Sequence, residues 1–140
     1  MIRTLLVLTL LALSTPVALA SKITVTIEGV HSDRGQVTVG LFSRAEGFPD
    51  GDYADKWIRV PAKTEPITVV FDDLAPGQYA VGAYHDENGN GKLDTNFIGW
   101  PIEGYALSNG IRLSIFRPRF KDSAFTVDGD GASVTLHIGY

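Results

Sequence analysis

Apolar and polar residues alternate with a period of two over much of the chain after residue 20. In the segment 23–27 isoleucine and valine alternate with threonine, and the segments 67–71 and 78–85 show a similar alternation. Successive side chains of a β-strand point to opposite faces, so this period is typical of strands with one buried face. We therefore expect strands over residues 23–27, 36–41, 57–60, 67–71, 78–85, 125–127 and 134–140.

Turn-forming residues separate the expected strands. The turn Asp33-Arg34-Gly35 predicts that the first two strands form a hairpin. Pro76-Gly77 fits a tight turn, because proline fixes φ and glycine takes a positive φ. Residues 43–55 predict a long loop with one helical turn. Since no segment has a sustained apolar period of 3.6 residues, the expected fold class is all-β, a single β-sandwich of about seven strands.

The first 20 residues have a different pattern from the rest of the chain. Arg3 is their only charged residue, residues 5–13 are an almost unbroken apolar run, and Ala18-Leu19-Ala20 ends the segment. This order is that of a secretory signal peptide cut after Ala20. A retained membrane anchor is the alternative, but a bilayer-spanning helix needs roughly 20 apolar residues. We expect a signal peptide over 1–20, one β-sandwich domain over 21–140 without a membrane span, and a periplasmic or secreted protein.

Composition and charge narrow the classes of function. The chain has 140 residues, a formal net charge of −4 and no cysteine. Without residues 1–20, 11 basic residues stand against 16 acidic ones, a net charge of −5. No block of lysine and arginine is present, so no nucleic-acid partner is expected. Because disulfides and zinc–thiolate sites need cysteine, an exported domain of this composition must be held by its core or by a metal ion.

The polar segment after residue 85 is the sharpest chemical motif in the sequence. Asp86, Asn88 and Asn90 recur at every second residue, and Gly91 follows at once. A loop that curls around Ca²⁺ offers oxygen ligands at positions 1, 3 and 5, a glycine at position 6 and a backbone carbonyl at position 7. Counted from the first aspartate, the candidate metal ligands are Asp86, Asn88, Asn90, the carbonyl of Lys92 and, at position 9, Asp94.

This motif departs from a full EF-hand loop at its end. Position 12 is Phe97 instead of a bidentate glutamate, and the flanking segments are expected to be strand and irregular loop instead of helices. Glu87 and Glu103 are additional candidate ligands. With so few carboxylates we expect weak binding of Ca²⁺, with a Kd of about 10⁻⁴–10⁻³ M. The alternative is a plain hairpin turn, since Asn-Gly is a strong hairpin signal.

The sequence gives little support to catalysis. None of the three histidines, His31, His85 and His137, lies at metal-ligand spacing from another, so a zinc site would need all three to converge from distant segments. His85 is placed to orient the polar loop. No Gly-x-Ser-x-Gly elbow and no glycine-rich phosphate loop is present. A hydrolase would need His85 or paired acids within hydrogen-bond reach in a cleft.

Two groups of side chains suggest a binding surface. Large aromatic residues lie in or near the expected loops, and if they were exposed in one patch they could stack on sugar rings; the alternative is packing in the core or the loops. The basic residues of segment 112–121 could meet an anionic polysaccharide or a phosphate group; the alternative is a solvated face beside the core, because they are interleaved with apolar residues. The aromatic residues are Tyr53, Trp57, Phe97, Trp100 and Tyr105.

Three segments carry a resemblance to a known family. They are Leu-Ala-Pro-Gly-Gln-Tyr-Ala-Val at 74–81, His-Asp-Glu-Asn-Gly-Asn-Gly-Lys-Leu-Asp at 85–94 and Gly-Trp-Pro-Ile-Glu-Gly-Tyr at 99–105, followed by Ser108-Asn109. With Gly35 and the segment 120–125, they resemble the exported bacterial family called domain of unknown function 2141. The resemblance covers essentially the whole chain after residue 20, although Trp100 stands where a smaller apolar residue is expected.

The resemblance implies export, a β-sandwich and no cofactor chemistry. The Leu-x-Pro-Gly-x-Tyr turn is also similar to prealbumin-like sandwich modules, so we expect a prealbumin-like or immunoglobulin-like arrangement. The family has no settled activity, and no catalytic residue is implied. We therefore expect a non-catalytic binding or accessory module of the cell envelope, with a calcium loop and an envelope polysaccharide or protein as partner. The alternatives are a hydrolase acting on envelope or extracellular carbohydrate, and a structural domain without an ion.

Overall fold

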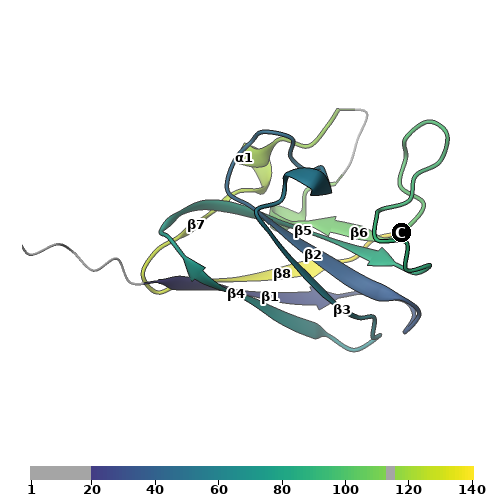
Figure 1. Ribbon diagram of the computed structural model, residues 1–140, viewed down its shortest axis with the longest axis horizontal. Coiled ribbons are helices and arrows are strands. Elements are labelled where there is room, and N and C mark those ends of the chain that lie inside the picture. The colour runs from purple at the N-terminus through teal and green to yellow at the C-terminus, as the bar shows by residue number, and fades with distance from the viewer. Residues whose placement is uncertain (1–19, 113–115) are drawn as a thin grey trace, which may run out of the picture.

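Two β-sheets pack face to face in the computed structural model, which describes residues 20–112 and 116–140 (Figure 1). The smaller sheet has three strands in the order β4-β1-β8. Strand β1 pairs antiparallel with β4 and parallel with β8. The expected signal peptide lies outside the described residues except for Ala20. The bounds of the strands are Ser21–Glu28 for β1, Ile67–Leu74 for β4 and Ala132–His137 for β8.

The larger sheet has five strands. Its order is β3-β2-β5-β6. Strand β6 pairs with residues 82–84 of β5, and β7 pairs with residues 77–79 of β5. The strands are β2 (Gln36–Phe42), β3 (Lys56–Pro61), β5 (Gly77–Asp86), β6 (Tyr105–Leu107) and β7 (Phe125–Val127). The short helices are η1 (Gly51–Tyr53), η2 (Ser108–Gly110) and α1 (Phe120–Ser123).

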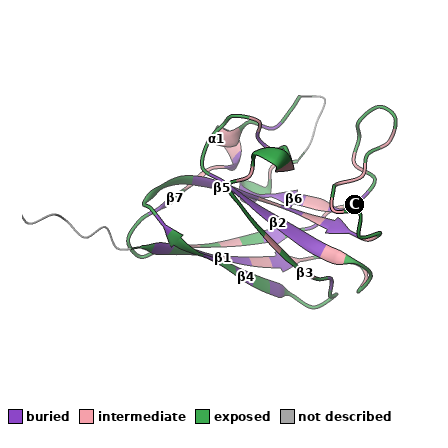
Figure 2. Ribbon diagram, viewed as in Figure 1, coloured by how far each residue is buried: buried purple, intermediate pink, exposed green. Residues whose placement is uncertain are grey.

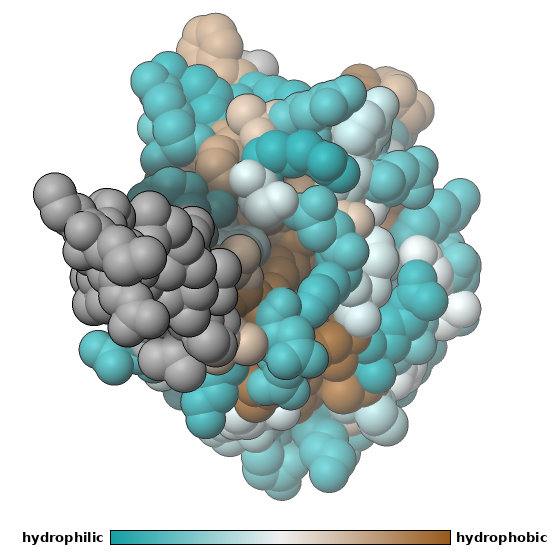
Figure 3. Space-filling model, turned by 60° about the vertical axis from the view of Figure 1, so that its left-hand side comes forward, coloured by the Kyte–Doolittle hydropathy of each residue, from teal (hydrophilic) through white to brown (hydrophobic). Residues whose placement is uncertain are grey.

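The main core lies between the two sheets and is built by the alternation of the sequence. Ile23, Val25 and Ile27 of β1 are fully buried, whereas the threonines between them are only partly buried. Figure 2 shows buried residues in the strands of both sheets. In Figure 3 the surface is mostly polar, and apolar side chains lie in a recess between polar rims. The all-β sandwich expected from the sequence is confirmed, with eight strands.

The expected hairpin between the first two strands is wrong. Strand β1 pairs with β4 and β8, whereas β2 pairs with β3 and β5, so the segment 29–35 crosses from one sheet to the other. The reason lies in β2, which is buried on both faces. Val39 faces the main core, and Phe42 packs on the outer side with Phe48 and Leu107. A strand that needs cover on both faces belongs in the middle of a sheet.

Several other expectations are confirmed. Strand β3 lies at the edge of its sheet. The segment 43–55 is a loop that contains one helical turn, η1. Phe48 of the loop 43–55 and Phe120 of α1 pack over one end of the outer face of the larger sheet. The rest of that face is left open to solvent and forms the groove described below. Among the described residues, no helix has the length and apolar character needed to cross a membrane.

Candidate functional site

The end of β5 sends two neighbouring polar side chains to opposite faces of the larger sheet. Strand alternation directs His85 inward with Val81 and Ala83, and directs Asp86 outward with Tyr84 and Gly82. Both His85 and Asp86 are 0% exposed. The chain thus builds two polar sites around one strand end. One site is the loop 86–94, and the other is a cluster around His85.

The Asp86 carboxylate organises the loop from its first position. Its Oδ2 accepts hydrogen bonds from the amide nitrogen of Gly91 (2.8 Å) and from Nε2 of Gln36 (2.8 Å). Its Oδ1 accepts one from the amide nitrogen of Asn90 (3.1 Å). Burial alone would raise the pKa of Asp86, but these hydrogen bonds outweigh it and hold the pKa below its ordinary value. The carboxylate is therefore charged at neutral pH.

The loop brings the side chains of Asn88, Asn90 and Asp94 together. Nδ2 of Asn88 lies 2.6 Å from one carboxylate oxygen of Asp94, and Nδ2 of Asn90 lies 2.8 Å and 2.9 Å from the two oxygens. The backbone amide of Lys92 donates to Oδ1 of Asn90. The Lys92 side chain is exposed. The side chains expected at positions 3, 5 and 9 of a calcium loop thus lie together, whereas Asp86 at position 1 bonds to the backbone amides of Asn90 and Gly91.

Glu103 accepts hydrogen bonds from both ends of this loop. Its Oε1 accepts from the amide of Glu87 (3.1 Å) and its Oε2 from the amide of Asp94 (3.0 Å), and it is 8% exposed. The Glu87 carboxylate turns away from the loop and lies 2.8 Å from Nε2 of His31. Of the two additional candidate ligands, Glu103 therefore lies against the loop and Glu87 belongs to the histidine cluster.

A short finger, residues 95–102, projects from the end of the loop. The amide of Ile102 bonds to the carbonyl of Asp94 and closes the base of the finger, and Asn96 holds its turn through hydrogen bonds from Ile98 and Trp100. Phe97 is 99% exposed and Trp100 is 46% exposed. These two expected sugar-stacking aromatics therefore point to solvent outside the groove.

The groove lies on the outer face of the larger sheet, beside the loop, and has a volume of about 740 Å³. Strand register places Trp57 beside Gly40, and Gly82 beside Leu107, so the two larger side chains pack over the glycine backbone. Trp57, Tyr84 and Tyr105 give the groove aromatic walls, and residues 91–93 of the loop form one rim. Charged side chains of both signs also line it, namely Asp50, Asp52, Arg59 and Lys92.

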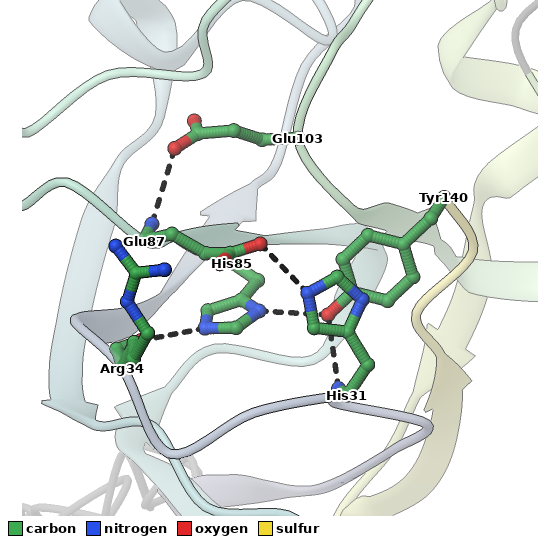
Figure 4. Close-up of polar contacts among 6 residues, drawn as sticks. All are labelled: His31, Arg34, His85, Glu87, Glu103 and Tyr140. Carbon is green, nitrogen blue, oxygen red and sulfur yellow. Dashed lines mark hydrogen bonds and ion pairs between the residues drawn. The ribbon is translucent and has the colours of Figure 1, made fainter.

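The second polar site joins His85 to residues from two distant segments (Figure 4). Nε2 of His85 lies 2.7 Å from the carbonyl of Arg34, and Nδ1 lies 2.7 Å from the hydroxyl of Tyr140. The ring of His31 stacks on Tyr140, with ring centroids 3.7 Å apart. His137 lies elsewhere, 3.4 Å from Glu28. Two of the three histidines thus converge, and the third does not.

Sequence reasoning missed several residues of the two sites. Gln36 holds Asp86 because β2 pairs with β5 in a register that sets these two residues opposite each other. Tyr140 reaches His31 because β8 runs parallel to β1, and the amide of Ile138 continues the pairing by donating to the carbonyl of Glu28. Both contacts follow from strand partners, which the spacing of residues in the sequence does not reveal.

Comparison with known proteins identifies one family. A family model described as an uncharacterized protein conserved in bacteria (DUF2141) matches residues 25–135. The match includes the loop 86–94, Glu103 and the strands that line the groove. No curated protein and no solved structure matches the chain.

Proposed function

The chain belongs to the bacterial family named domain of unknown function 2141, and from this premise we propose that it is an exported, non-catalytic module that binds carbohydrate in its groove, with Ca²⁺ held in the loop 86–94. The observation that carries the proposal is the position of that loop, which forms one rim of the groove. An ion in the loop would therefore fix one wall of the binding site.

The lining of the groove suits a carbohydrate. Ligand sites in proteins are typically concave and enclose about 300–1,000 Å³, and this groove has about 740 Å³. Trp57 is 38% exposed and its ring packs against the backbone of Gly40 and Gly51, so it is a firmly held aromatic wall. Sugars present apolar ring faces and many hydroxyl groups. Aromatic walls fit the ring faces, and charged groups of both signs bind the hydroxyl groups.

The loop supports an ion through the types and placement of its side chains. Ca²⁺ prefers carboxylate, amide and backbone oxygens. A half-turn of the Asn88 and Asn90 amides would place oxygen next to the Asp94 carboxylate, at the expense of the hydrogen bonds that their oxygens now accept from the amides of Asn90 and Lys92. The hydroxyl of Tyr84, in the floor of the groove, donates to the carbonyl of Gly91 at 2.9 Å. This contact ties the loop to the binding surface.

The hydrolase alternative receives less support. His85, the expected base, faces the interior of the sandwich, and both of its ring nitrogens have hydrogen-bond partners. Asp50 and Asp52 line the groove, but Oδ1 of Asp50 accepts the amide of Asp52 and caps η1. This contact gives Asp50 a role in positioning the loop.

Affinity electrophoresis tests the proposal. Native gels containing soluble peptidoglycan fragments, a neutral glucan or an acidic polysaccharide are run with 5 mM Ca²⁺ and with chelator. We expect at least one glycan to retard the protein, more strongly with Ca²⁺. Trp57→Ala should lose most of the retardation. Trp100→Ala, which removes a partly exposed tryptophan outside the groove, should keep it. Equal behaviour of both variants, or no retardation by any of these glycans, would contradict carbohydrate binding. Release of reducing ends from the bound glycan would contradict a non-catalytic role.

A further inference from the structure

We propose that His31, His85 and Glu87 form a second metal site, which takes a divalent transition-metal ion of the zinc class and is separate from the calcium loop. One ligand atom from each of these residues lies within 4.8 Å of the other two. Two imidazole nitrogens and one carboxylate oxygen are a ligand set that zinc and its neighbours favour, whereas Ca²⁺ takes oxygen ligands. The two sites therefore differ in the ion that they select.

An ion would draw the three ligand atoms closer together and displace the Tyr140 hydroxyl from Nδ1 of His85. Zinc–nitrogen and zinc–oxygen bonds of about 2.0–2.2 Å in a tetrahedron set the ligand atoms roughly 3.3 Å apart. Nε2 of His31 and Oε1 of Glu87 lie 2.8 Å apart, close to that spacing. The His31 side chain is 50% exposed and that of Glu87 is 26% exposed, so both have room to adjust around an ion. His85 is buried and supplies the fixed point of the site.

The hydrogen bonds of His85 leave the lone pair of one ring nitrogen directed toward the proposed metal site. A carbonyl only accepts hydrogen bonds, so Nε2, 2.7 Å from the carbonyl of Arg34, carries the ring proton. In the neutral ring the lone pair is then on Nδ1, the nitrogen on the Tyr140 side. Metal-binding histidines commonly have their second nitrogen fixed in this way.

Gly35 enforces this arrangement. A Cβ atom at this position would lie 2.1 Å from the carbonyl oxygen of Asp86, so the chain passes too close to β5 for any side chain. The close approach brings the preceding carbonyl, that of Arg34, to His85. The fold therefore sets the tautomer of His85 through its backbone.

Tyr140 covers the site and can leave it. Its hydroxyl donates to Nδ1 of His85 and accepts the amide of His31. The residue is 58% exposed, which allows the hydroxyl to swing away when the ion takes the lone pair of Nδ1.

The chain supplies a matched control for this site. Nε2 of His137 lies 3.4 Å from a carboxylate oxygen of Glu28, on the pair of strands β8 and β1. This pair has the same chemistry as His31 and Glu87 but lacks the third ligand. Among the described residues, only His31, His85 and Glu87 form a group of three histidine or acidic side chains with ligand atoms within 4.8 Å of one another. If His31 and Glu87 were only an exposed histidine–carboxylate pair, His31→Ala and His137→Ala would change the zinc affinity equally.

Zinc titration calorimetry of the purified protein in 10 mM Ca²⁺ tests the proposal. We expect one zinc ion per chain, with affinity at least about tenfold weaker in His31→Ala and in Glu87→Gln and unchanged in His137→Ala. In ¹⁵N spectra of the histidine rings, zinc should shift Nδ1 of His85 and Nε2 of His31. No zinc binding, equal losses in His31→Ala and His137→Ala, or no shift at His85 would overturn the proposal.

The same titrations separate this site from the calcium loop. Asp94→Asn should remove binding of Ca²⁺ and keep binding of zinc. His31→Ala should weaken binding of zinc and keep binding of Ca²⁺. If the loop binds no Ca²⁺, the zinc result in Asp94→Asn still decides whether the histidine cluster is a site. If zinc binding disappears with Asp94→Asn, the ion was in the loop and the histidine cluster is not a metal site.

Discussion

Replacing Asp86 by asparagine should destabilise the protein without any ion present. The side chain keeps its size, but the charge is lost and an amide nitrogen replaces one accepting oxygen. If the oxygen of the asparagine stays with Gly91 and Gln36, the new amide nitrogen faces the amide of Asn90, which is also a donor. Two hydrogen bonds then lose their charge, at about 1 kcal/mol each, and one is lost, at about 1–3 kcal/mol. We expect a total loss of about 3–5 kcal/mol in the free energy of unfolding.

Urea denaturation in the presence of chelator measures this loss. Asp94→Asn is the matched control in the same loop, and it should cost less than about 1 kcal/mol because its partners are the exposed amides of Asn88 and Asn90. The difference between wild type and Asp86→Asn should also shrink on acidification. The folded state lowers the pKa of Asp86 below its ordinary value of 3.8, so its contribution is complete above that pH and is lost as the pH falls through the lower, folded value. A loss below about 1 kcal/mol at pH 7, or a difference that does not shrink at low pH, would refute the reasoning.

Two further substitutions test how the fold supports the sites. Gly35→Ala places a Cβ 2.1 Å from the carbonyl oxygen of Asp86 at a φ of 70°, and should destabilise the protein by at least about 3 kcal/mol in a thermal melt. Gly99→Ala is the control, because this glycine has a φ of 82° and no atom within 4 Å, and it should cost only about 1–2 kcal/mol. Similar costs for the two variants would show that the close approach at Gly35 is not a constraint. Ser108→Ala removes a buried hydroxyl that accepts from the amide of Val81 and donates to the carbonyl of Ser123, and should cost about 2–4 kcal/mol in urea denaturation. Ser123→Ala removes a buried hydroxyl that has no hydrogen-bond partner among the described residues, so it should be close to neutral; a cost as large as that of Ser108→Ala would contradict this difference.

Seven of the eight strands were predictable because each has a local pattern, whereas the short strand β6 was not expected. Alternation at 23–27 predicts β1, and Pro61 marks the end of the edge strand β3. Strand partners depend on contacts between distant segments, which no local pattern encodes. The expected hairpin failed for this reason: the turn at Asp33–Gly35 is present, but the apolar residues on both faces of β2 require two neighbours in the larger sheet.

The loop 86–94 could be predicted from local sequence, whereas the histidine cluster could not. Asp86, Asn88, Asn90 and Asp94 are close in sequence, so their spacing was enough to expect them around one point. The histidine cluster was not expected, because His31 and Tyr140 meet only through the parallel pairing of β1 and β8. Glu103 was named as a ligand candidate, but its hydrogen bonds to the two ends of the loop depend on the path of the chain through residues 95–102.

The most direct test of the calcium loop is thermal unfolding with 10 mM Ca²⁺ and with chelator. For a Kd of about 10⁻⁴ M, this concentration stabilises the folded state by about 2.7 kcal/mol. For a domain of this size that corresponds to a rise of roughly 10 °C in the midpoint. We expect this rise in the wild type and in His31→Ala, and no rise in Asp94→Asn. An unchanged midpoint in the wild type, or an equal rise in Asp94→Asn, would contradict this expectation.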